Sequence, residues 1–301
     1  MNKLHAERAT KLTQAEFLAA ISRIEKFSPA PRILSRALRL LRDLQSDIHG
    51  IAALVSSDPA LAADIIRCSN SAFYSAGSSV ESVEQAVAKI GFKETMRLLN
   101  LAVARIASGR ELRGYGISAD DFWAESLFNG LFLQALAEQT RGADPDEAYT
   151  VGLLRFIGRL AINQCVEKIG EEFFWVGNET IAQWERETVG FPQAKAGAIL
   201  LANWQFSAKT VQAIEGQDAP GALAERSWLA EALCFASELV PQGLGAPFNL
   251  ALSSPVPDEP RRDAFMHENG LTVESVDALL AKTRENFAEV GNAFGGRQKT
   301  V

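Results

Sequence analysis

Helical periodicity is the sequence feature that most constrains how this chain folds. Apolar residues recur at spacings of three and four in nearly every strongly patterned segment, and no segment shows a clear strand-like alternation. The sequence therefore predicts an all-α protein. Helices are expected over 13–25, 92–107, 119–140, 145–167, 179–189, 192–204, 208–215, 221–240 and 272–290.

Residues that favour helix starts support these assignments. Thr13 and Glu16 form a capping box, in which each side chain bonds the other residue's backbone N–H. Further N-caps are expected at Ser118, Asp144, Asn178, Ser207 and Thr272.

Two breaks in the pattern suggest how the chain is divided. Glycines and polar residues at 108–117 are expected to connect two subdomains, and 241–260 holds five of the eleven prolines, which predicts an irregular excursion. The expected organisation is an N-terminal helical subdomain (13–110), a second helical subdomain (117–240), the proline-rich excursion (241–260) and a C-terminal helical extension (261–292).

Composition is that of a protein with a large core and no membrane span. The chain has 301 residues, 47% of them hydrophobic, and no stretch approaches the roughly 18 apolar residues that a spanning helix requires. Its N-terminus lacks an apolar signal region. Cys68, Cys165 and Cys234 are far apart and are expected to be reduced core residues. Together these features favour the cytoplasm.

Net charge disfavours nucleic acid and anionic membranes as partners. The formal charge is −7 and the sequence pI is about 5.2. The one arginine-rich stretch, from Arg97 to Arg113, is interrupted by apolar residues and glycines. We expect it to be a solvated helix flank and loop, with a contact to an anionic ligand or partner as the alternative.

The segment 56–91 carries the most identifiable pattern. Asp58 is a good N-cap and Pro59 suits the first helical position. Ser82 and Gln85 have the spacing of a capping box, and Gly91 can end the helix that follows. Spacing alone predicts two ordinary capped helices.

The order of residues in this segment resembles the HDOD family, helical modules of bacterial signal-transduction proteins. The resemblance rests on Asp58-Pro59, Leu61, Arg67, Asn70-Ser71-Ala72, Tyr74, Val80, Ser82, Gln85-Ala86 and Gly91, and extends from about Phe27 to about Gln217. It implies a multi-helix fold in which the N-terminal subdomain packs on an HD-like bundle. It also implies an interaction surface around Asp58, Pro59, Arg67, Asn70, Ser71 and Tyr74.

HDOD modules resemble HD-type phosphohydrolases, whose histidines and aspartates hold hydrolytic metal ions. Here other side chains stand at the positions that resemble the metal ligands: Glu125, Arg155, Phe156, Gln193, Gln217 and Ser237. The adjacent His-Asp pair of the enzymes is replaced by Arg155-Phe156. The three histidines, His5, His49 and His267, pair with no local ligand and are expected to be solvated or structural.

These replacements argue against metal chemistry. A guanidinium stays protonated and only donates hydrogen bonds, so Arg155 cannot coordinate a cation. Unit charges about 4 Å apart interact by about 4 kcal/mol at an effective dielectric near 20, and a divalent ion would feel roughly twice that repulsion. Phe156 stands where the enzymes have an aspartate, so a carboxylate ligand of the metal is missing. We expect no metal, no cofactor and no enzymatic activity.

The same positions predict a new contact. Because the two histidines they replace would bind one ion, Glu125 and Arg155 are expected to lie close together and to form a direct ion pair. The alternative is that both side chains point to solvent. A buried Glu125–Arg155 ion pair would be weak evidence for stability, but it would fix the relative position of two helices.

Other catalytic patterns are lacking. The sequence has no G-x-S-x-G elbow, no phosphate-binding loop and no local Cys–His signature. The resemblance therefore implies a noncatalytic regulatory module that contacts signalling proteins, with room for a small ligand in the former metal cavity. Two alternatives stay open: a phosphohydrolase with a rearranged site using Glu125, Asp120 or Asp121, and a binder of a nucleotide second messenger.

Overall fold

The computed structural model describes residues 12–24, 83–95, 97, 112–203, 206–244 and 259–293. Within these ranges the secondary structure is helical, and β pairing is limited to the isolated bridge Leu112–Ile117. The all-α prediction is confirmed. The α-helices are α1 (Gln14–Ser22), α5 (Val83–Ile90), α7 (Ala119–Thr140), α8 (Pro145–Leu153), α9 (Ile157–Ile169), α10 (Ile181–Thr188), α11 (Gln193–Asn203), α12 (Ala208–Glu215), α13 (Trp228–Leu244), α14 (Glu259–Glu268) and α15 (Val273–Ala293).

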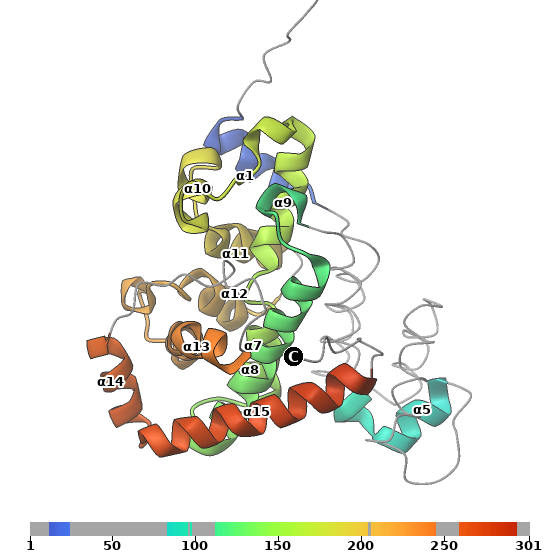
Figure 1. Ribbon diagram of the computed structural model, residues 1–301, viewed down its shortest axis with the longest axis vertical. Helices are drawn as coiled ribbons and strands as arrows, with labels where there is room; N and C mark the ends of the chain where they lie inside the picture. The colour runs from blue at the N-terminus through green and yellow to red at the C-terminus, as the bar shows by residue number, and fades with distance from the viewer. Residues whose placement is uncertain are drawn as a thin grey trace, which may run out of the picture.

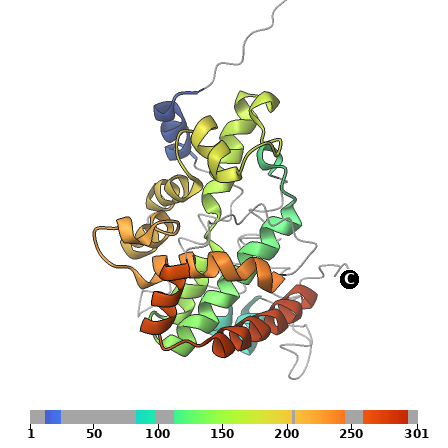
Figure 2. The ribbon, with the colours of Figure 1, turned by 60° about the vertical axis from the view of Figure 1, so that its left-hand side comes forward.

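Helices α7 and α8 pack along each other and form the centre of the described structure. Helices α1, α9, α10 and α11 gather at one end, and α13, α14 and α15 at the other (Figures 1 and 2). Helix α11 packs against α9, α12 and α1, whereas α13 and α15 both pack against α7. The corner between α8 and α9 therefore lies where the two groups of helices meet.

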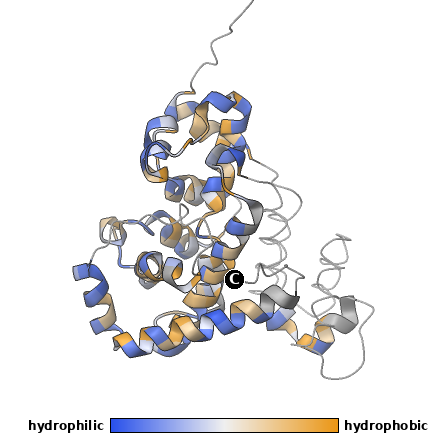
Figure 3. Cartoon of the chain, viewed as in Figure 1, coloured by the Kyte–Doolittle hydropathy of each residue, from blue (hydrophilic) through white to orange (hydrophobic). Residues whose placement is uncertain are grey.

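The hydrophobic core follows α7. Residues 124–137 are all buried, among them Leu127, Phe128, Leu131 and Leu133, so this part of α7 is enclosed on every side. Figure 3 shows hydrophilic residues along the outer helices α14 and α15, with hydrophobic residues interspersed. No helix in the described ranges has the length and apolar character to cross a membrane.

Most of the expected helix caps are present. Thr13 and Glu16 bond each other's backbone N–H groups, and Ser118, Asp144 and Ser207 each accept from the N–H three residues on. The cap expected at Asn178 is wrong. Thr180 performs that role and accepts from the N–H of Gln183, so α10 begins two residues later than predicted.

The predicted helix 145–167 is broken at Arg155 and Phe156. Helix α8 ends at Leu153 and α9 begins at Ile157. Close backbone contacts surround the corner: a Cβ on Gly152 would lie 2.5 Å from Asn129 O, and one on Gly158 would lie 1.9 Å from Gln193 O. Tertiary packing, rather than local propensity, accounts for the turn.

The C-terminal helices differ from the expected bounds. Helix α13 continues through Pro241 to Leu244, and α14 begins at Glu259, inside the expected excursion. Pro241 lies in the last turn, where the lost backbone hydrogen bond disrupts little helix, and Pro260 lies in the first turn of α14, where a missing N–H is tolerated. Residues 245–258 lie outside the described ranges.

Candidate functional site

The positions that resemble the enzyme's metal ligands are all buried around the α8–α9 corner or on the helices that pack near it. Each is at most 5% exposed. They are Glu125 on α7, Arg155 and Phe156 at the corner, Gln193 at the start of α11, Gln217 after α12 and Ser237 on α13.

Direct contacts join several of these positions to the corner. The Nε2 of Gln217 donates to the backbone carbonyl of Arg155 at 3.2 Å, and the carbonyl of Gln193 lies against Gly158. Ser237 is placed less directly, since its hydroxyl donates to the carbonyl of Cys234 at 2.5 Å.

Arg155 bonds a side chain that sequence reasoning missed. Its Nη1 donates to Oδ1 of Asn129 at 2.9 Å, and Asn129 Nδ2 donates to the backbone carbonyl of Glu125 at 2.8 Å. Arg155 thus bonds an amide of α7, and the direct ion pair with Glu125 stays a prediction. Burial lowers the pKa of Arg155, while the charges of Asp218 and then Glu125 act to raise it.

Phe156 lies next to two buried cations. The guanidinium carbons of Arg155 and Arg159 lie 5.0 and 4.8 Å from the centroid of its ring. Both distances are within cation–π range. The Phe156 ring therefore packs against two positively charged groups.

Arg159 belongs to a second buried polar cluster centred on Glu185. Arg159 Nε lies 3.5 Å from Glu185 Oε1, the Tyr115 hydroxyl donates to the same oxygen at 3.0 Å, and the Gln193 N–H donates to Oε2 at 2.8 Å. Burial raises the pKa of Glu185, and the charge of Arg159 is the strongest opposing influence. The cluster ties α9 to α10 and α11.

Several polar atoms around the corner have no hydrogen-bond partner in the part of the chain that the structure describes. They are Arg155 Nε, Arg159 Nε and Nη1, Gln193 Oε1 and Gln217 Oε1. The orientation of the Gln217 amide is fixed, because its nitrogen donates to two carbonyls, those of Arg155 and Ile214. Buried donors and acceptors of this kind normally have partners.

The side chains at these positions do not suit a divalent metal ion. The guanidinium of Arg155 and the ring of Phe156 supply no atom that could coordinate a metal. The amide and hydroxyl oxygens at the other positions are weak metal ligands, which leaves Glu125 as the one carboxylate. Within the described ranges, no three His, Cys, Asp or Glu residues are grouped so that they could hold a metal. His267 is exposed on α14, and His5 and His49 lie outside those ranges.

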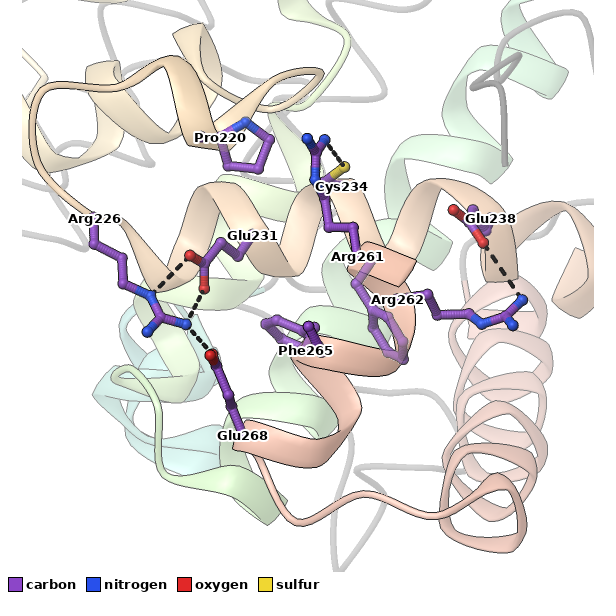
Figure 4. A pocket seen from close by; sticks show the side chains of 12 residues that line it. Pro220, Arg226, Glu231, Cys234, Glu238, Arg261, Arg262, Phe265 and Glu268 are labelled. Carbon is purple, nitrogen blue, oxygen red and sulfur yellow. Dashed lines mark hydrogen bonds and ion pairs between the residues drawn. The ribbon is translucent and has the colours of Figure 1, made fainter. Parts of the chain in front are cut away.

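A pocket of about 230 Å³ lies between α13 and α14 (Figure 4). Arg226 on one side pairs with Glu231 and Glu268, and Arg262 lies 3.8 Å from Glu238. These ion pairs join the two helices across the pocket.

Cys234 lines the pocket and contacts an arginine of α14. Arg261 Nη1 donates to Cys234 Sγ at 3.8 Å. Burial raises the pKa of the Cys234 thiol, whereas the charges of Arg261 and Arg155 lower it.

The expected interaction surface lies outside the described ranges, so it stays a prediction. Its residues are Asp58, Pro59, Arg67, Asn70, Ser71 and Tyr74. Of the carboxylates considered for a rearranged site, Asp121 accepts a hydrogen bond from the Ser118 hydroxyl at 2.7 Å, as part of the α7 N-terminus. The side chain of Asp120 is also outside the description.

Helical spacing holds a signal for the residues that were missed. Asn129 follows Glu125 by four residues on α7, so both lie on one helix face. Glu185 follows Ile181 and Trp184 at apolar-face spacing in α10, which places a carboxylate among buried residues.

Comparison with known proteins gives the family. The HDOD domain model matches residues 28–220. The chain belongs to the HDOD family. A curated protein from Treponema pallidum (strain Nichols), described as uncharacterized, is 27% identical over 152 residues, which cover 49% of this chain and 29% of that protein. The HDOD chain thus spans less than a third of the length of this curated relative.

Solved structures share the fold at low sequence identity. An HDOD domain protein of unknown function from Geobacter sulfurreducens has a TM-score of 0.67 at 19% identity, covering 94% of this chain and 98% of its own. A "Putative phosphohydrolase" from Shewanella amazonensis SB2B has a TM-score of 0.66 at 22% identity, covering 93% and 98%. A "Putative signal transduction protein" from Marinobacter aquaeolei VT8 has a TM-score of 0.67 at 22% identity, covering 94% and 65%. At these identities the likeness shows the fold alone.

Proposed function

We propose that this protein is a noncatalytic signal-transduction module that acts through contacts with other regulatory proteins. Its HDOD fold derives from a metal-dependent phosphohydrolase architecture, and the metal centre has become a structural polar cluster. The contacts are made by the surface around Asp58 to Tyr74.

One observation carries the noncatalytic part of the proposal. Arg155 is 3% exposed and bonded to Asn129, and its guanidinium packs on the ring of Phe156. A buried, permanently charged cation at the position of a metal ligand opposes the binding of a divalent ion. Metal-activated water, which this class of hydrolysis needs at neutral pH, then has no source.

Metal analysis combined with turnover assays tests this part. The purified full chain, incubated with excess Mn²⁺ and then desalted, should retain far less than one metal ion per chain. It should also hydrolyse neither cyclic dinucleotides nor nucleoside phosphates. Stoichiometric Mn²⁺ together with turnover that Glu125→Ala abolishes would establish the alternative, a phosphohydrolase with a rearranged site.

Affinity capture from the native host tests the contact surface. The tagged full chain and its Arg67→Glu variant are compared by quantitative mass spectrometry. We expect at least one protein to be recovered with the wild type and depleted with Arg67→Glu. Identical recovery with Arg67→Glu and with a second variant, Tyr74→Ala, would contradict the assignment of this surface.

A further inference from the structure

Helix α14 lies at the outer edge of the described structure (Figure 1). Of the described helices it packs chiefly against α13, and Phe265 is the one buried residue in Glu259–Glu268. The next helix, α15, packs on both α7 and α13 and buries Val276, Leu279 and Leu280. Much less apolar contact therefore holds α14 than holds the helix that follows it.

A single aromatic side chain anchors α14. The ring centroid of Phe265 lies 4.8 Å from that of Phe235 and 6.1 Å from that of Trp228, both on α13. Just beyond the helix, Oδ1 of Asn269 accepts a hydrogen bond from Trp228 Nε1 at 2.8 Å. Aromatic pairs at these separations attract each other beyond the effect of burial alone. The apolar attachment of α14 therefore depends on Phe265.

Ion pairs also join α14 to α13. Arg226 pairs with Glu231 of α13 and with Glu268 of α14, and Arg262 of α14 lies 3.8 Å from Glu238 of α13 (Figure 4). The side chains of Arg226 and Glu268 are 63% and 47% exposed. Pairs with this exposure contribute little stability and are screened by salt. The electrostatic part of the attachment should therefore weaken as ionic strength rises.

The contact between the two helices is also incompletely filled. The pocket of about 230 Å³ lies between them and is lined by Cys234 and Phe235 of α13 and by Arg261 and Ala264 of α14. Atoms that line an open space lack dispersion contacts on that side. Helix α14 thus covers this part of α13 without packing closely against all of it.

An undocked α14 would not remain helical. It has ten residues, and isolated helices shorter than about 12 to 15 residues are marginal in water. Loss of the contacts with α13 and loss of the helix are therefore one event, which exposes the backbone amides of α14 to solvent.

We propose that α14 is a salt-sensitive lid on α13, which opens by local unfolding while the helices around α7 stay folded. Opening uncovers the Cys234 thiol and the ring of Phe235, a residue that is 4% exposed when the lid is closed. Elements that move in regulation are drawn from the least stable parts of a fold. The inference goes beyond the proposed function and does not depend on it.

Hydrogen–deuterium exchange of the full chain, followed by peptide mass spectrometry at constant pH, tests the lid. In about 50 mM NaCl, peptides from α14 should exchange faster than peptides from α13 and α15. In about 500 mM NaCl the α14 rate should rise about threefold or more relative to the α15 rate. An α14 peptide as protected as that of α15, or an α14 rate that salt leaves unchanged, would overturn the proposal.

Two carboxylates of α14 provide matched variants. Glu268→Gln removes a pair that joins the helices, whereas Asp263→Asn removes a carboxylate whose partner, Arg262, lies on the same helix. At low salt, Glu268→Gln should raise the α14 exchange rate about threefold and reduce its response to salt. Asp263→Asn should not raise the rate. Equal α14 rates in the two variants would refute the role of the ion pairs.

Phe265→Ala tests the aromatic anchor. It should make exchange of α14 fast at both salt concentrations, while peptides from α7 and α9 keep their wild-type rates. Alkylation of Cys234 by iodoacetamide should become faster in the same variant. If α7 and α9 also lose protection, the variant has unfolded and Glu268→Gln decides. Wild-type protection of α14 in a folded Phe265→Ala protein would contradict the lid.

Discussion

Arg155 and Arg159 lie four residues apart and are both buried, yet they have different electrostatic partners. Arg155 bonds the amide of Asn129, whereas Arg159 lies 3.5 Å from the buried carboxylate of Glu185. Removing one partner of a buried ion pair leaves an unpaired charge, which is far more costly than replacing a cation held by a neutral group. Burial alone therefore does not predict which arginine stabilises the fold.

Identical substitutions at these two positions should have unequal effects on stability. Arg159→Met should lower the free energy of unfolding by about 3 kcal/mol, because it leaves Glu185 without its cation. Arg155→Met should lower it by only about 1 kcal/mol, because it leaves the Oδ1 of Asn129, a neutral acceptor, without its donor. Urea unfolding of both variants measures the difference. Equal losses would mean that Arg155 has a carboxylate partner as strong as that of Arg159.

Ionisation of the buried Glu185 carboxyl should lower the free energy of unfolding as pH rises. Burial raises its pKa above the ordinary 4.5, so between these two values the folded state binds more protons than the unfolded state. The stability that Glu185 contributes is present below about pH 4.5 and is lost as pH rises through the folded pKa.

Two variants test whether Glu185 lowers the free energy of unfolding as pH rises. Glu185→Gln should flatten the decline in unfolding free energy above pH 4.5. Tyr115→Phe removes a hydrogen bond that favours the ionised form, so it should steepen the decline. Unfolding by urea across pH 4.5 to 8 gives the slopes. A slope unchanged in Glu185→Gln would contradict the account.

At the scale of elements, the caps were predictable and the α8–α9 corner was not. Thr13 and Glu16 are three residues apart, so the sequence alone contains their reciprocal bonds. The corner depends on Gly152 meeting Asn129 and Gly158 meeting Gln193, contacts between residues distant in the sequence. The site positions come from the family resemblance and stay a prediction, whereas the hydrogen bond between Asn129 and Arg155 follows only from the packed helices.

Gly158 should be intolerant of a side chain. A Cβ there would lie 1.9 Å from Gln193 O and 2.6 Å from Gly197 N, both backbone atoms that cannot move aside cheaply. Gly158→Ala should lower the free energy of unfolding by about 3 kcal/mol. Gly221→Ala is the control, because its Cβ would meet no atom within 4 Å. Equal thermal midpoints for the two variants would show that α9 and α11 are packed less closely.

At the scale of the whole molecule, the C-terminal helices are integral to the structure. The family model ends at residue 220, but the likeness to solved structures covers 93% of this chain or more in the three reported above. Helix α15 packs on α7 and α13, and Arg284 Nε donates to the carbonyl of Gly243 at 2.8 Å. Helices α13 and α14 also build the pocket beside Cys234. The expected division into two subdomains and a C-terminal helical extension stays a prediction.

Anomalous diffraction from crystals soaked in Mn²⁺ tests the central claim most directly. The account predicts no anomalous peak between Glu125 and Arg155, with the Arg155 guanidinium bonded to Asn129. A strong peak at that place, with Arg155 displaced from Asn129, would contradict a noncatalytic module built on a converted metal centre.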